Sequence, residues 1–493
     1  MDQRTIVQTL QGLDTTGMSR RRVLNLAAMA ALAAPLAACA GDERTRRTAP
    51  TTDPAGSTAP VDTDRPENDT YPYDEAKTLF ESLDWPTTNI PDPQSKVTVT
   101  MAITSDENAE VRHAQFAKFF RELHPNIEIK REITPWDDFL TKYMTQAAGG
   151  SLPDLMYSHY SWGQNLIKNN IIAPLDDFIA ATPDFNTDDF TATARSYWEK
   201  DGKLHGVPTD SAPKMLWYNK EMFDKAGVEY PDESWTWQKV QEAAIELTSG
   251  KGIKKIFGMV QMPVPYPDLT PIYLLPFGAR FLSQDETEVM IDSDTARDAL
   301  KPWVDLQVKH AAIPSIAEMQ ARENADPYRA NQAAMAINGT WILNDLLNLP
   351  PETEFDWGMS HMPSGPEGRS APGVGSAFGL TTKAANPEAA WIVLNAFLSS
   401  AGAQYFRFSP PARLSAIDAN LTAMKVPDQV ITDTKAALQD YATSDGVLKM
   451  PATQKVVDTA TPIWDRVRTG KLSLDDALKQ IKERVTPVAK ENV

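Results

Sequence analysis

The stretch from Asp201 to Gly227 constrains the fold more than any other part of this sequence. Gly202 marks a short turn, and Pro208 then holds the chain extended. Met215 to Tyr218 is a run of strand-favouring residues, and Gly227 ends the short helical segment that follows it. This order of turn, extended crossing, strand and helix indicates a chain that passes from one folded body into another.

Residues 201–210 and 216–227 resemble the inter-lobe crossing of the extracellular solute-binding proteins of ABC importers. The similarity is to the carbohydrate class of that family, which is related to maltose-binding protein. It extends over roughly residues 96–488, as several motifs in the order that the family has them. The resemblance implies an α/β periplasmic-binding-protein fold, in which two doubly wound lobes enclose a ligand cleft and are joined by several crossings.

Length and charge narrow the classes of partner. With 493 residues, the chain can form two or three domains with large cores. Its formal net charge of −18 argues against a nucleic acid or an anionic membrane surface as partner, because both favour a basic face. Twelve tryptophans and thirteen tyrosines suit a sugar or polyol better. Cys39 is the only cysteine, so no disulfide can form within the chain.

The first 38 residues have the pattern of an export signal. Ser19–Arg22 precedes the apolar run Val23–Ala38, which is short for a membrane span. The arginines resemble a twin-arginine signal, and Leu36–Cys39 is similar to a bacterial lipobox, which implies a lipid on Cys39. The alternative is an incidental cysteine behind an ordinary secretion signal. We expect an exported protein that is anchored to the cell membrane at Cys39 and faces the periplasm or the cell exterior.

Two segments separate this signal from the folded body. Residues 39–70 contain almost no large apolar side chain, so burial cannot offset the entropy of ordering them, and we expect a flexible tether. Residues 71–95 form an N-terminal extension with Leu79, Phe80 and Trp85 at amphipathic spacing. The prolines that follow forbid a long helix. We expect one or two helical turns that pack on the body.

The body begins with an alternation of strand and helix. Val97–Ile103 is a candidate buried strand, Asp106 can cap the helix after it, and Asn126–Lys130 is the next strand. This order implies a parallel, doubly wound sheet whose ligands collect at the carboxyl ends of the strands. Asp106 and Glu107 lie at such an end and are candidate ligand contacts, although helix capping explains Asp106 equally well.

Further motifs of the resemblance place aromatic residues at the cleft. The loop Ser158–Trp162 falls where relatives have ligand-contacting aromatic residues, which implicates Tyr160 and Trp162. Tyr266 follows a proline, as in the proline-tyrosine pair that relatives hold against the sugar. The Asn-Gly-Thr-Trp sequence that ends at Trp341 resembles the motif that supplies a stacking tryptophan.

Residues of the crossings complete the candidate set. Asp210 closely follows a predicted strand and is a polar candidate. Gly375 lies in the return crossing, Ala371–Leu380, where glycine allows close main-chain approach, hinge motion or both. Arg413 belongs to a third connection, Ser409–Arg413, and either reaches the cleft or forms a salt bridge between the lobes.

The chemistry of sugars favours these residue types. Sugars present apolar C–H faces that stack on aromatic rings and hydroxyls that need donors and acceptors. Trp162, Trp341 and Tyr266 are therefore the expected platforms, whereas Trp217 fits a platform and the core equally well. Four other tryptophans are assigned to the core: Trp136, Trp198, Trp303 and Trp391.

No pattern favours catalysis, a metal or a cofactor. The six histidines lie far apart, and none forms a pair at metal-binding spacing. A phosphate loop, a nucleophile elbow and a nucleotide fingerprint in its strand–helix context are all absent. A carboxylate pair at glycosidase separation is compatible with 66 acidic residues, but no feature favours one.

We therefore predict two lobes, each built from two segments: residues 96–210 with 376–409, and residues 211–375 with 410–488. The predicted function is to capture a sugar or oligosaccharide as a monomer, close around it and deliver it to the permease of an ABC transporter. Two alternatives differ in class. One is a secreted, lipid-anchored carbohydrate-active enzyme, and the other is a receptor of the same fold for another solute, such as glycerol phosphate or a peptide.

Overall fold

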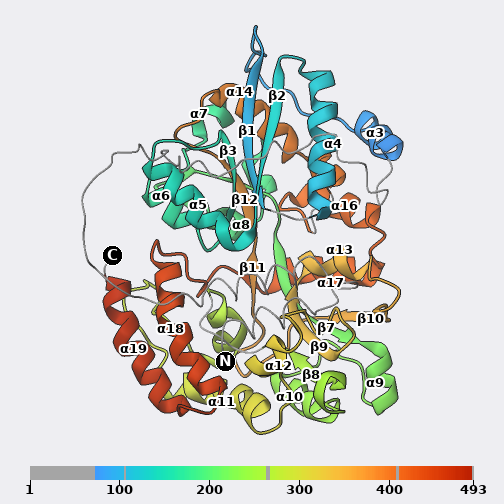
Figure 1. Ribbon diagram of the computed structural model, residues 1–493, viewed down its shortest axis with the longest axis vertical. Helices are drawn as coiled ribbons and strands as arrows, with labels where there is room; N and C mark the ends of the chain where they lie inside the picture. The colour runs from blue at the N-terminus through green and yellow to red at the C-terminus, as the bar shows by residue number, and fades with distance from the viewer. Residues whose placement is uncertain (1–72, 105–106, 262–266, 407–409, 491–493) are drawn as a thin grey trace, which may run out of the picture. The chain divides into compact units, whose positions relative to one another are not determined.

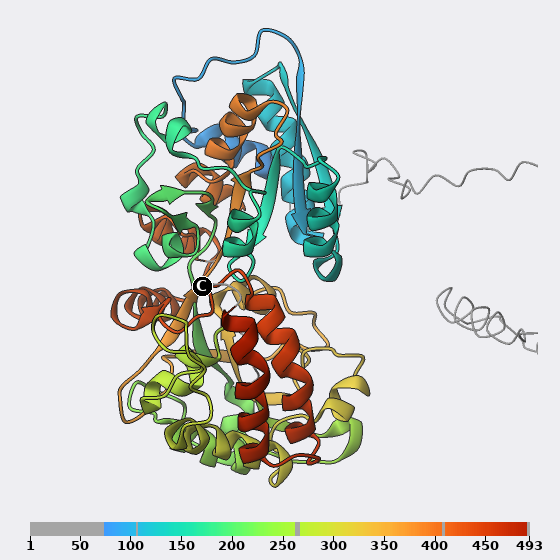
Figure 2. The same cartoon turned by 90° about the vertical axis from the view of Figure 1, so that its left-hand side faces the viewer.

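The computed structural model (Figure 1), seen from a second side in Figure 2, describes residues 73–104, 107–261, 267–406 and 410–490. The predicted signal, the tether and Cys39 lie outside these residues, as do Asp106 and Tyr266. The described residues belong to one compact unit. Among their helices, none combines the length and the apolar character that crossing a lipid bilayer requires.

The first sheet defines what we call the first lobe. Its strands, in spatial order, are β2 (Ile127–Thr134), β1 (Val97–Thr104), β3 (Leu155–His159), β12 (Ser376–Leu380) and β6 (Val207–Pro208) (Figure 1). β1 runs parallel to β2 and β3, as the order of strand and helix predicts. β12 pairs antiparallel with β3 and with β6. The sheet is mixed rather than wholly parallel, because the chain leaves through β6 and returns through β12 without a helical crossover.

Helices cover this sheet, and their packing against it forms the hydrophobic core of the first lobe. They are α4 (Glu107–Leu123), α5 (Trp136–Ala148), α6 (Gly163–Lys168), α7 (Asp176–Ala180), α8 (Ala192–Ser196), α14 (Pro387–Phe397) and α15 (Ser400–Phe406), with the 3₁₀ turn η1 (Thr187–Asp189) and the ribbon of β4 (Glu199–Lys200) and β5 (Lys203–Leu204). α14 is buried on every face, which explains why its sequence is apolar all round. The indole N–H of Trp391 donates to Thr182 Oγ1 at 2.9 Å, so its one polar group is satisfied.

The N-terminal extension contributes to the same core. Helix α3 (Tyr73–Ser82) lies beside α4 (Figure 1). The ring of Phe80 is 4.4 Å from that of Trp85 and 4.7 Å from that of Phe119. The Trp85 indole N–H donates to the Phe80 carbonyl at 2.7 Å. The described part of the extension therefore packs on the first lobe through aromatic contacts.

The second sheet defines the second lobe. Its strands, in spatial order, are β13 (Ala442–Thr443), β11 (Ala371–Val374), β7 (Ala212–Asn219), β9 (Ala333–Gly339) and β8 (Phe257–Val260), and β10 (Trp357–Ser360) also pairs with β7. β7 is buried along its whole length. Because side chains alternate along a strand, Leu216 and Tyr218 enter one hydrophobic core while Met215 and Trp217 enter another.

The helices of the second lobe surround this sheet. They are α9 (Lys220–Ala226), α10 (Trp237–Glu246), α11 (Asp294–Val308), α12 (Ile316–Gln320), α13 (Leu343–Leu346), α16 (Ile417–Ala423), α17 (Asp428–Asp440), α18 (Thr453–Arg468) and α19 (Leu474–Lys490), with the short turns η2 (Gly252–Lys254), η3 (Thr270–Leu274), η4 (Leu275–Phe277), η5 (Thr340–Ile342) and η6 (Leu414–Ala416). α18 and α19 lie side by side (Figure 2). Thr236 caps α10 by accepting the Lys239 N–H at 3.3 Å.

The segments that connect the two sheets lie next to one another. β6 continues through Asp210 into β7, and β11 continues through Gly375 into β12. Asp210 forms an isolated antiparallel bridge with Pro411 of the third connection. The Ser376 N–H donates to Oδ1 of Asp210 at 2.9 Å. One residue therefore links all three predicted crossings.

Candidate ligand-binding site

Aromatic side chains gather on the first lobe where β3 ends. We call this group the aromatic cluster, and it consists of Trp136, His159, Tyr160 and Trp162. Trp136 begins α5, and the other three lie at the end of β3 and in the loop behind it. The rings of Trp136 and Trp162 are 4.8 Å apart, and Trp136 meets His159 edge-on at 4.9 Å. These centroid distances are within the range of stabilising aromatic pairs.

The members of the aromatic cluster differ in exposure. Tyr160 and Trp162, which the motifs implicate in ligand contact, are both buried. Trp136, by contrast, is 42% exposed, so its assignment to the core was wrong. It is the first residue of α5, ahead of the buried positions Phe139 and Tyr143, and it lies against Trp162 without being enclosed. The ring that the cluster exposes is therefore Trp136.

His159 supplies a neutral polar group beside these rings. Its Nδ1 lies 2.8 Å from Oγ of Ser161. Burial, and after it the ammonium of Lys214, lower the pKa of His159 to about 3. The imidazole is therefore uncharged near neutral pH, and it can donate from one nitrogen and accept at the other. Because Lys214 is on β7, charges of the second lobe act on this residue of the first.

Trp341 is an exposed tryptophan of the second lobe. It is the central residue of η5, which follows β9 directly, and it is 42% exposed. A Cβ built on Gly339 would lie 2.0 Å from the six-membered ring of Trp341, so the indole covers a position that only glycine can fill. This contact gives a physical reason for the glycine two residues before the tryptophan in the predicted motif.

A buried ion pair lies next to Trp341. Nζ of Lys214 is 2.6 Å from Oδ2 of Asp268, and the two side chains are 9% and 3% exposed. The same ammonium is 5.7 Å from the centre of the Trp341 ring. We call these two residues the Lys214–Asp268 pair. Sequence reasoning missed both, although a lysine within the fully buried strand β7 is itself a signal, because buried charges occur mainly where they are paired or used.

The burial of Trp217 corrects its candidacy as a ligand contact. Its side chain is fully buried among the residues of a hydrophobic core, and its indole N–H donates to the Asn338 carbonyl at 2.9 Å. Along β7 it points to the face opposite Leu216 and Tyr218. Trp217 is therefore a structural residue of the second lobe.

Arg413 forms a salt bridge, which was the alternative to a ligand contact. Its Nε donates to the Leu398 carbonyl at 2.7 Å, and its Nη1 lies 3.4 Å from Oδ2 of Asp189. The guanidinium is also 4.5 Å from the centre of the Phe190 ring. These contacts anchor the third connection to the first lobe. The side chain of Arg413 is buried, and these contacts use it to stabilise the fold rather than to bind a ligand.

Asp210 and Gly375 are in contact where two of the three crossings meet. Oδ1 of Asp210 accepts hydrogen bonds from the Ser376 N–H at 2.9 Å and the Thr209 hydroxyl at 2.5 Å. Burial raises the pKa of Asp210 to about 6, against the opposing effect of these two hydrogen bonds. A Cβ on Gly375 would lie 1.9 Å from the Asp210 carbonyl oxygen. Gly375 is thus required for the approach of the two crossings.

Three predicted contacts fall outside what the structure describes. Asp106 and Tyr266 lie outside the described residues, and so does the side chain of Glu107, whose backbone begins α4. Within the described residues, no group of three or more His, Cys, Asp or Glu side chains could hold a metal ion. The candidate site therefore consists of the aromatic cluster, Trp341 and the Lys214–Asp268 pair.

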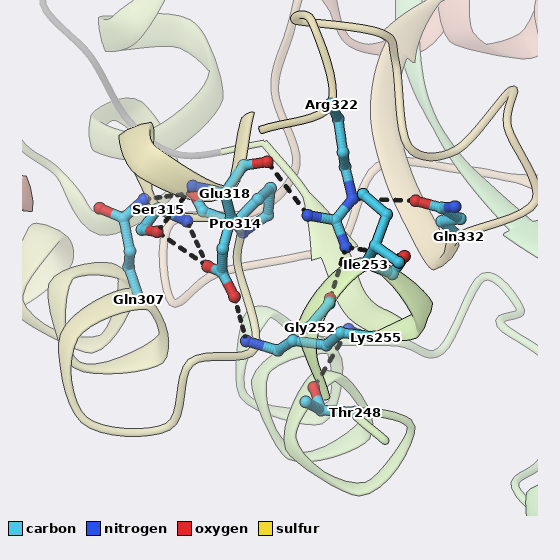
Figure 3. Close-up of polar contacts among 11 residues, drawn as sticks. Thr248, Gly252, Ile253, Lys255, Gln307, Pro314, Ser315, Glu318, Arg322 and Gln332 are labelled. Atoms are coloured by element: carbon cyan, nitrogen blue, oxygen red, sulfur yellow. Dashed lines mark hydrogen bonds and ion pairs between the residues drawn. The ribbon is translucent and has the colours of Figure 1, made fainter. Parts of the chain in front are cut away.

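A second lysine–carboxylate pair lies elsewhere in the second lobe. Figure 3 shows Lys255 and Glu318, whose Nζ and Oε1 are 2.9 Å apart. Glu318 also accepts hydrogen bonds from the Ser315 N–H at 2.9 Å and the Ser315 hydroxyl at 2.8 Å. The Glu318 N–H donates in turn to Oγ of Ser315 at 3.2 Å, which completes the capping box of α12. Arg322 donates to the Gly252 carbonyl and to Gln332 in the same cluster. The hydrogen-bond partners named in this network are therefore all groups of the protein itself.

A hollow of about 270 Å³ lies between α10 and α11 in the second lobe. None of its residues belongs to the candidate site. Its lining residues are Gln241, Ile245, Asp298, Lys301, Pro302, Asp305, Leu306 and His310. It is small for a drug-sized or oligosaccharide ligand, because typical ligand pockets are about 300–1,000 Å³.

The two sheets and their crossings define a periplasmic-binding-protein fold. A solved structure described as an ABC substrate-binding protein of Listeria monocytogenes in complex with cycloalternan superimposes with a TM-score of 0.71 at 23% identity, over 80% of this chain and 99% of that one. The predicted fold class is thereby confirmed. The model of the family described as bacterial extracellular solute-binding protein matches residues 104–404, which is more than half of the chain. This chain belongs to that family.

Curated relatives differ in what their names say they bind. An arabinooligosaccharide-binding protein of Halalkalibacterium halodurans is 26% identical over 275 residues, which are 53% of this chain and 58% of that protein. An sn-glycerol-3-phosphate-binding periplasmic protein of Shigella dysenteriae is 24% identical over 237 residues, 45% of this chain and 51% of that protein. The chain spans 66% or less of the length of the curated relatives named here and of those matched first.

Proposed function

We propose that this protein captures a neutral sugar or oligosaccharide between its lobes and delivers it to the permease of an ABC transporter. The observation that carries the proposal is the pair of exposed indoles, Trp136 beside the end of β3 and Trp341 beside the end of β9. Large exposed aromatic rings flanked by buried polar groups are typical of carbohydrate sites, because sugars need both stacking and hydrogen bonding.

The polar groups beside these rings suit hydroxyls. His159 is neutral, and Ser161 engages its Nδ1, so its Nε2 is the nitrogen that can meet a hydroxyl. The Lys214–Asp268 pair offers a donor and an acceptor with no net charge. A sugar hydroxyl also donates and accepts, so each of these groups can find a partner on a carbohydrate. The ligands in the names of the arabinooligosaccharide-binding relative and the cycloalternan complex support this class.

Ligand capture proceeds through closure of the lobes about the crossings at Asp210, Gly375 and Pro411. The ligand stabilises the closed form, which the permease then recognises. Small-angle scattering should give a smaller radius of gyration with the bound sugar than without it. An unchanged radius at saturation would contradict closure.

Export and anchoring depend on the segment before the tether. The twin-arginine signal directs export, and a lipid on Cys39 holds the mature protein at the membrane as a monomeric receptor. Cys39→Ala should release the protein in soluble form. Metabolic labelling with a fatty acid should mark the wild type, and its failure to do so would contradict the anchor.

A thermal-shift screen tests the proposed ligand class. The probes are glucose, maltose, maltotriose and arabinotriose, with sn-glycerol 3-phosphate as the charged comparator. A ligand at a hundred times its Kd stabilises the folded state by about 2.7 kcal/mol, which raises the melting temperature by a few degrees. Stabilisation by sn-glycerol 3-phosphate and by none of the sugars would favour the other solute class. Turnover of an oligosaccharide by the purified protein would favour the enzyme alternative.

A further inference from the structure

The Lys214–Asp268 pair has an unusual position for a buried charge pair. Lys214 extends from the fully buried strand β7, and Asp268 lies just before η3. The two charged atoms are 2.6 Å apart. Removing both charges from water costs free energy that their attraction only partly offsets. A function that needs both charges at this place would explain why the pair is kept in the candidate site.

An exposed ring of the second lobe lies beside the pair, and the charges of the pair act on groups of the first lobe. The exposed indole of Trp341 lies 5.7 Å from the Lys214 ammonium. On the first lobe, Lys214 contributes to the lowered pKa of His159, and the Asp268 carboxylate contributes, after burial, to the raised pKa of Tyr197. The buried hydroxyl of Tyr197 has no hydrogen-bond partner within the described residues. The pair therefore lies beside an exposed ring of the second lobe, and its charges reach buried polar groups of the first lobe.

Charge balance decides which ligands such a group accepts. A buried ammonium alone would attract phosphate or carboxylate strongly, because charge-assisted hydrogen bonds are strong at low dielectric. With a carboxylate 2.6 Å away, the net charge is zero, and an anionic ligand would meet the negative Asp268 as well as Lys214. A neutral polyol meets no such repulsion. Adjacent hydroxyls can accept from the ammonium and donate to the carboxylate at the same time.

We propose that the Lys214–Asp268 pair is the specificity determinant of this site, which binds adjacent hydroxyls of a sugar ring stacked on Trp341 and rejects phosphorylated or acidic ligands. This inference rests on the proposed function. Lys214 donates to one hydroxyl, Asp268 accepts from its neighbour, and the closed site keeps both groups out of water. Removing only the carboxylate leaves an unbalanced ammonium that attracts anions.

Calorimetric titration of three variants tests this role. The probes are maltotriose and arabinotriose as neutral ligands, and glucose 6-phosphate and sn-glycerol 3-phosphate as anions. Asp268→Asn leaves Lys214 without its carboxylate, and Lys214→Met combined with Asp268→Asn removes both charges. Glu318→Gln is the matched control, because it alters the other lysine–carboxylate pair, away from the candidate site.

The expected pattern separates charge from hydrogen bonding. The wild type binds a neutral probe and neither anion. Asp268→Asn binds the neutral probe at least about tenfold more weakly, since a hydrogen bond to a charged group is lost, and it gains measurable affinity for an anion. The affinity of the double variant for the neutral probe also falls at least about tenfold, but this variant gains no affinity for an anion. Glu318→Gln binds as the wild type does.

Opposite results overturn the proposal. If Asp268→Asn is folded by circular dichroism and keeps both wild-type affinity for the sugar and rejection of the anions, the pair does not determine specificity. If that variant fails to fold, wild-type sugar affinity in the folded double variant overturns the proposal by itself. A wild type that binds an anion and no neutral probe refutes the proposed function and this inference together, whereas unchanged variants refute the inference alone.

Discussion

The second lobe contains two lysine–carboxylate pairs with similar chemistry and different surroundings. Each lysine has a carboxylate within 3 Å and an aromatic ring within 6 Å of its ammonium: the Lys214–Asp268 pair has Trp341, and the Lys255–Glu318 pair has Phe257. Phe257 is fully buried, whereas Trp341 is 42% exposed. The ring beside one pair is core, and the ring beside the other is open to a ligand.

The two pairs also differ in what satisfies them. Ser315 contributes two hydrogen bonds to Glu318, and this closes the cap of α12 (Figure 3). For the Lys214–Asp268 pair, the charges act on polar groups of the first lobe, and one of these groups, the Tyr197 hydroxyl, has no partner among the described residues. The difference teaches that the chemistry of a buried pair does not make it a site. What matters is whether the protein itself uses all of the hydrogen-bonding capacity.

Truncating the buried ring gives the largest expected effect. Phe257→Ala should lower the free energy of unfolding by about 3–5 kcal/mol, because it removes a fully buried aromatic side chain from a packed core. Chemical denaturation of the variant measures this loss. The folded fraction should bind the screened sugar with wild-type affinity. If stability stayed unchanged and sugar affinity fell, the ring would belong to a binding site after all.

Truncating the exposed ring should reverse this pattern. Trp341→Ala should weaken sugar binding roughly tenfold to a thousandfold, since both stacking and burial of the ligand face are lost. Its apo melting temperature should stay near that of the wild type, because nearly half of the side chain is exposed. Calorimetric titration and apo melting of the same preparation separate the two effects. Strong destabilisation with unchanged affinity would make Trp341 structural.

Removing the carboxylate of the Lys255–Glu318 pair should lower the free energy of unfolding moderately, by an amount that depends on pH. Burial pushes the pKa of Glu318 upward, but hydrogen bonds from Ser315 and Lys255 outweigh it and leave that pKa below its ordinary value of 4.5. The folded state then binds fewer protons than the unfolded state, so this stabilisation is present above pH 4.5 and is lost as the pH falls.

The variant Glu318→Gln measures that contribution. At pH 7 it should be less stable than the wild type by about 1–3 kcal/mol, because Lys255 loses its partner. The difference should shrink below pH 4.5, where the carboxyl of the unfolded wild type binds a proton and the folded one does so only at lower pH. Denaturant titrations at pH 7 and pH 4 check this. A difference that did not depend on pH would mean that packing, not charge, holds the capping box.

Asp210 extends the comparison to a carboxylate that accepts hydrogen bonds from two neutral donors, the Thr209 hydroxyl and the Ser376 N–H. Its pKa of about 6 lies above the ordinary 3.8, so between these values the folded state binds more protons than the unfolded state. Stability should therefore fall as the pH rises through this window. Asp210→Asn keeps the acceptor oxygen without the charge. It should be more stable than the wild type by about 1–2 kcal/mol at pH 7 and equal to it near pH 4.

Denaturant titrations of the wild type and of Asp210→Asn from pH 4 to pH 7 measure this difference in stability. Two parallel stability curves would show that Asp210 does not titrate in this range. In that case, its hydrogen bonds with Ser376 and Thr209 would outweigh burial.

The framework of the fold could be predicted because its signals are local. The strand β1 begins at the predicted residue, Val97, and β2 begins one residue after its predicted start at Asn126. The crossing at Gly375 follows from a glycine that a close main-chain contact requires. The direction of β12 could not be predicted in the same way. A strand's own sequence does not say whether it pairs parallel or antiparallel, because that depends on where the chain has come from.

The candidate site was predictable only in part. The motif identified Trp341, and the covered Gly339 explains its spacing. Trp136 and Trp217 were assigned less well, because neither the first turn of a helix nor one position in a strand reveals which side faces solvent. Lys214 was overlooked, although a charge in an apolar run is a signal that could have identified it. Asp268 carried no such signal, since its partner is distant in the sequence and only the folded chain brings the two together.

A crystal structure with the neutral sugar that gives the largest thermal shift tests the central claim most directly. We predict a sugar ring against the exposed face of Trp341, with hydroxyls within hydrogen-bond distance of Lys214 Nζ and the Asp268 carboxylate. A sugar bound in the hollow between α10 and α11 would contradict it. So would a sugar that leaves Trp341 and the Lys214–Asp268 pair uncontacted.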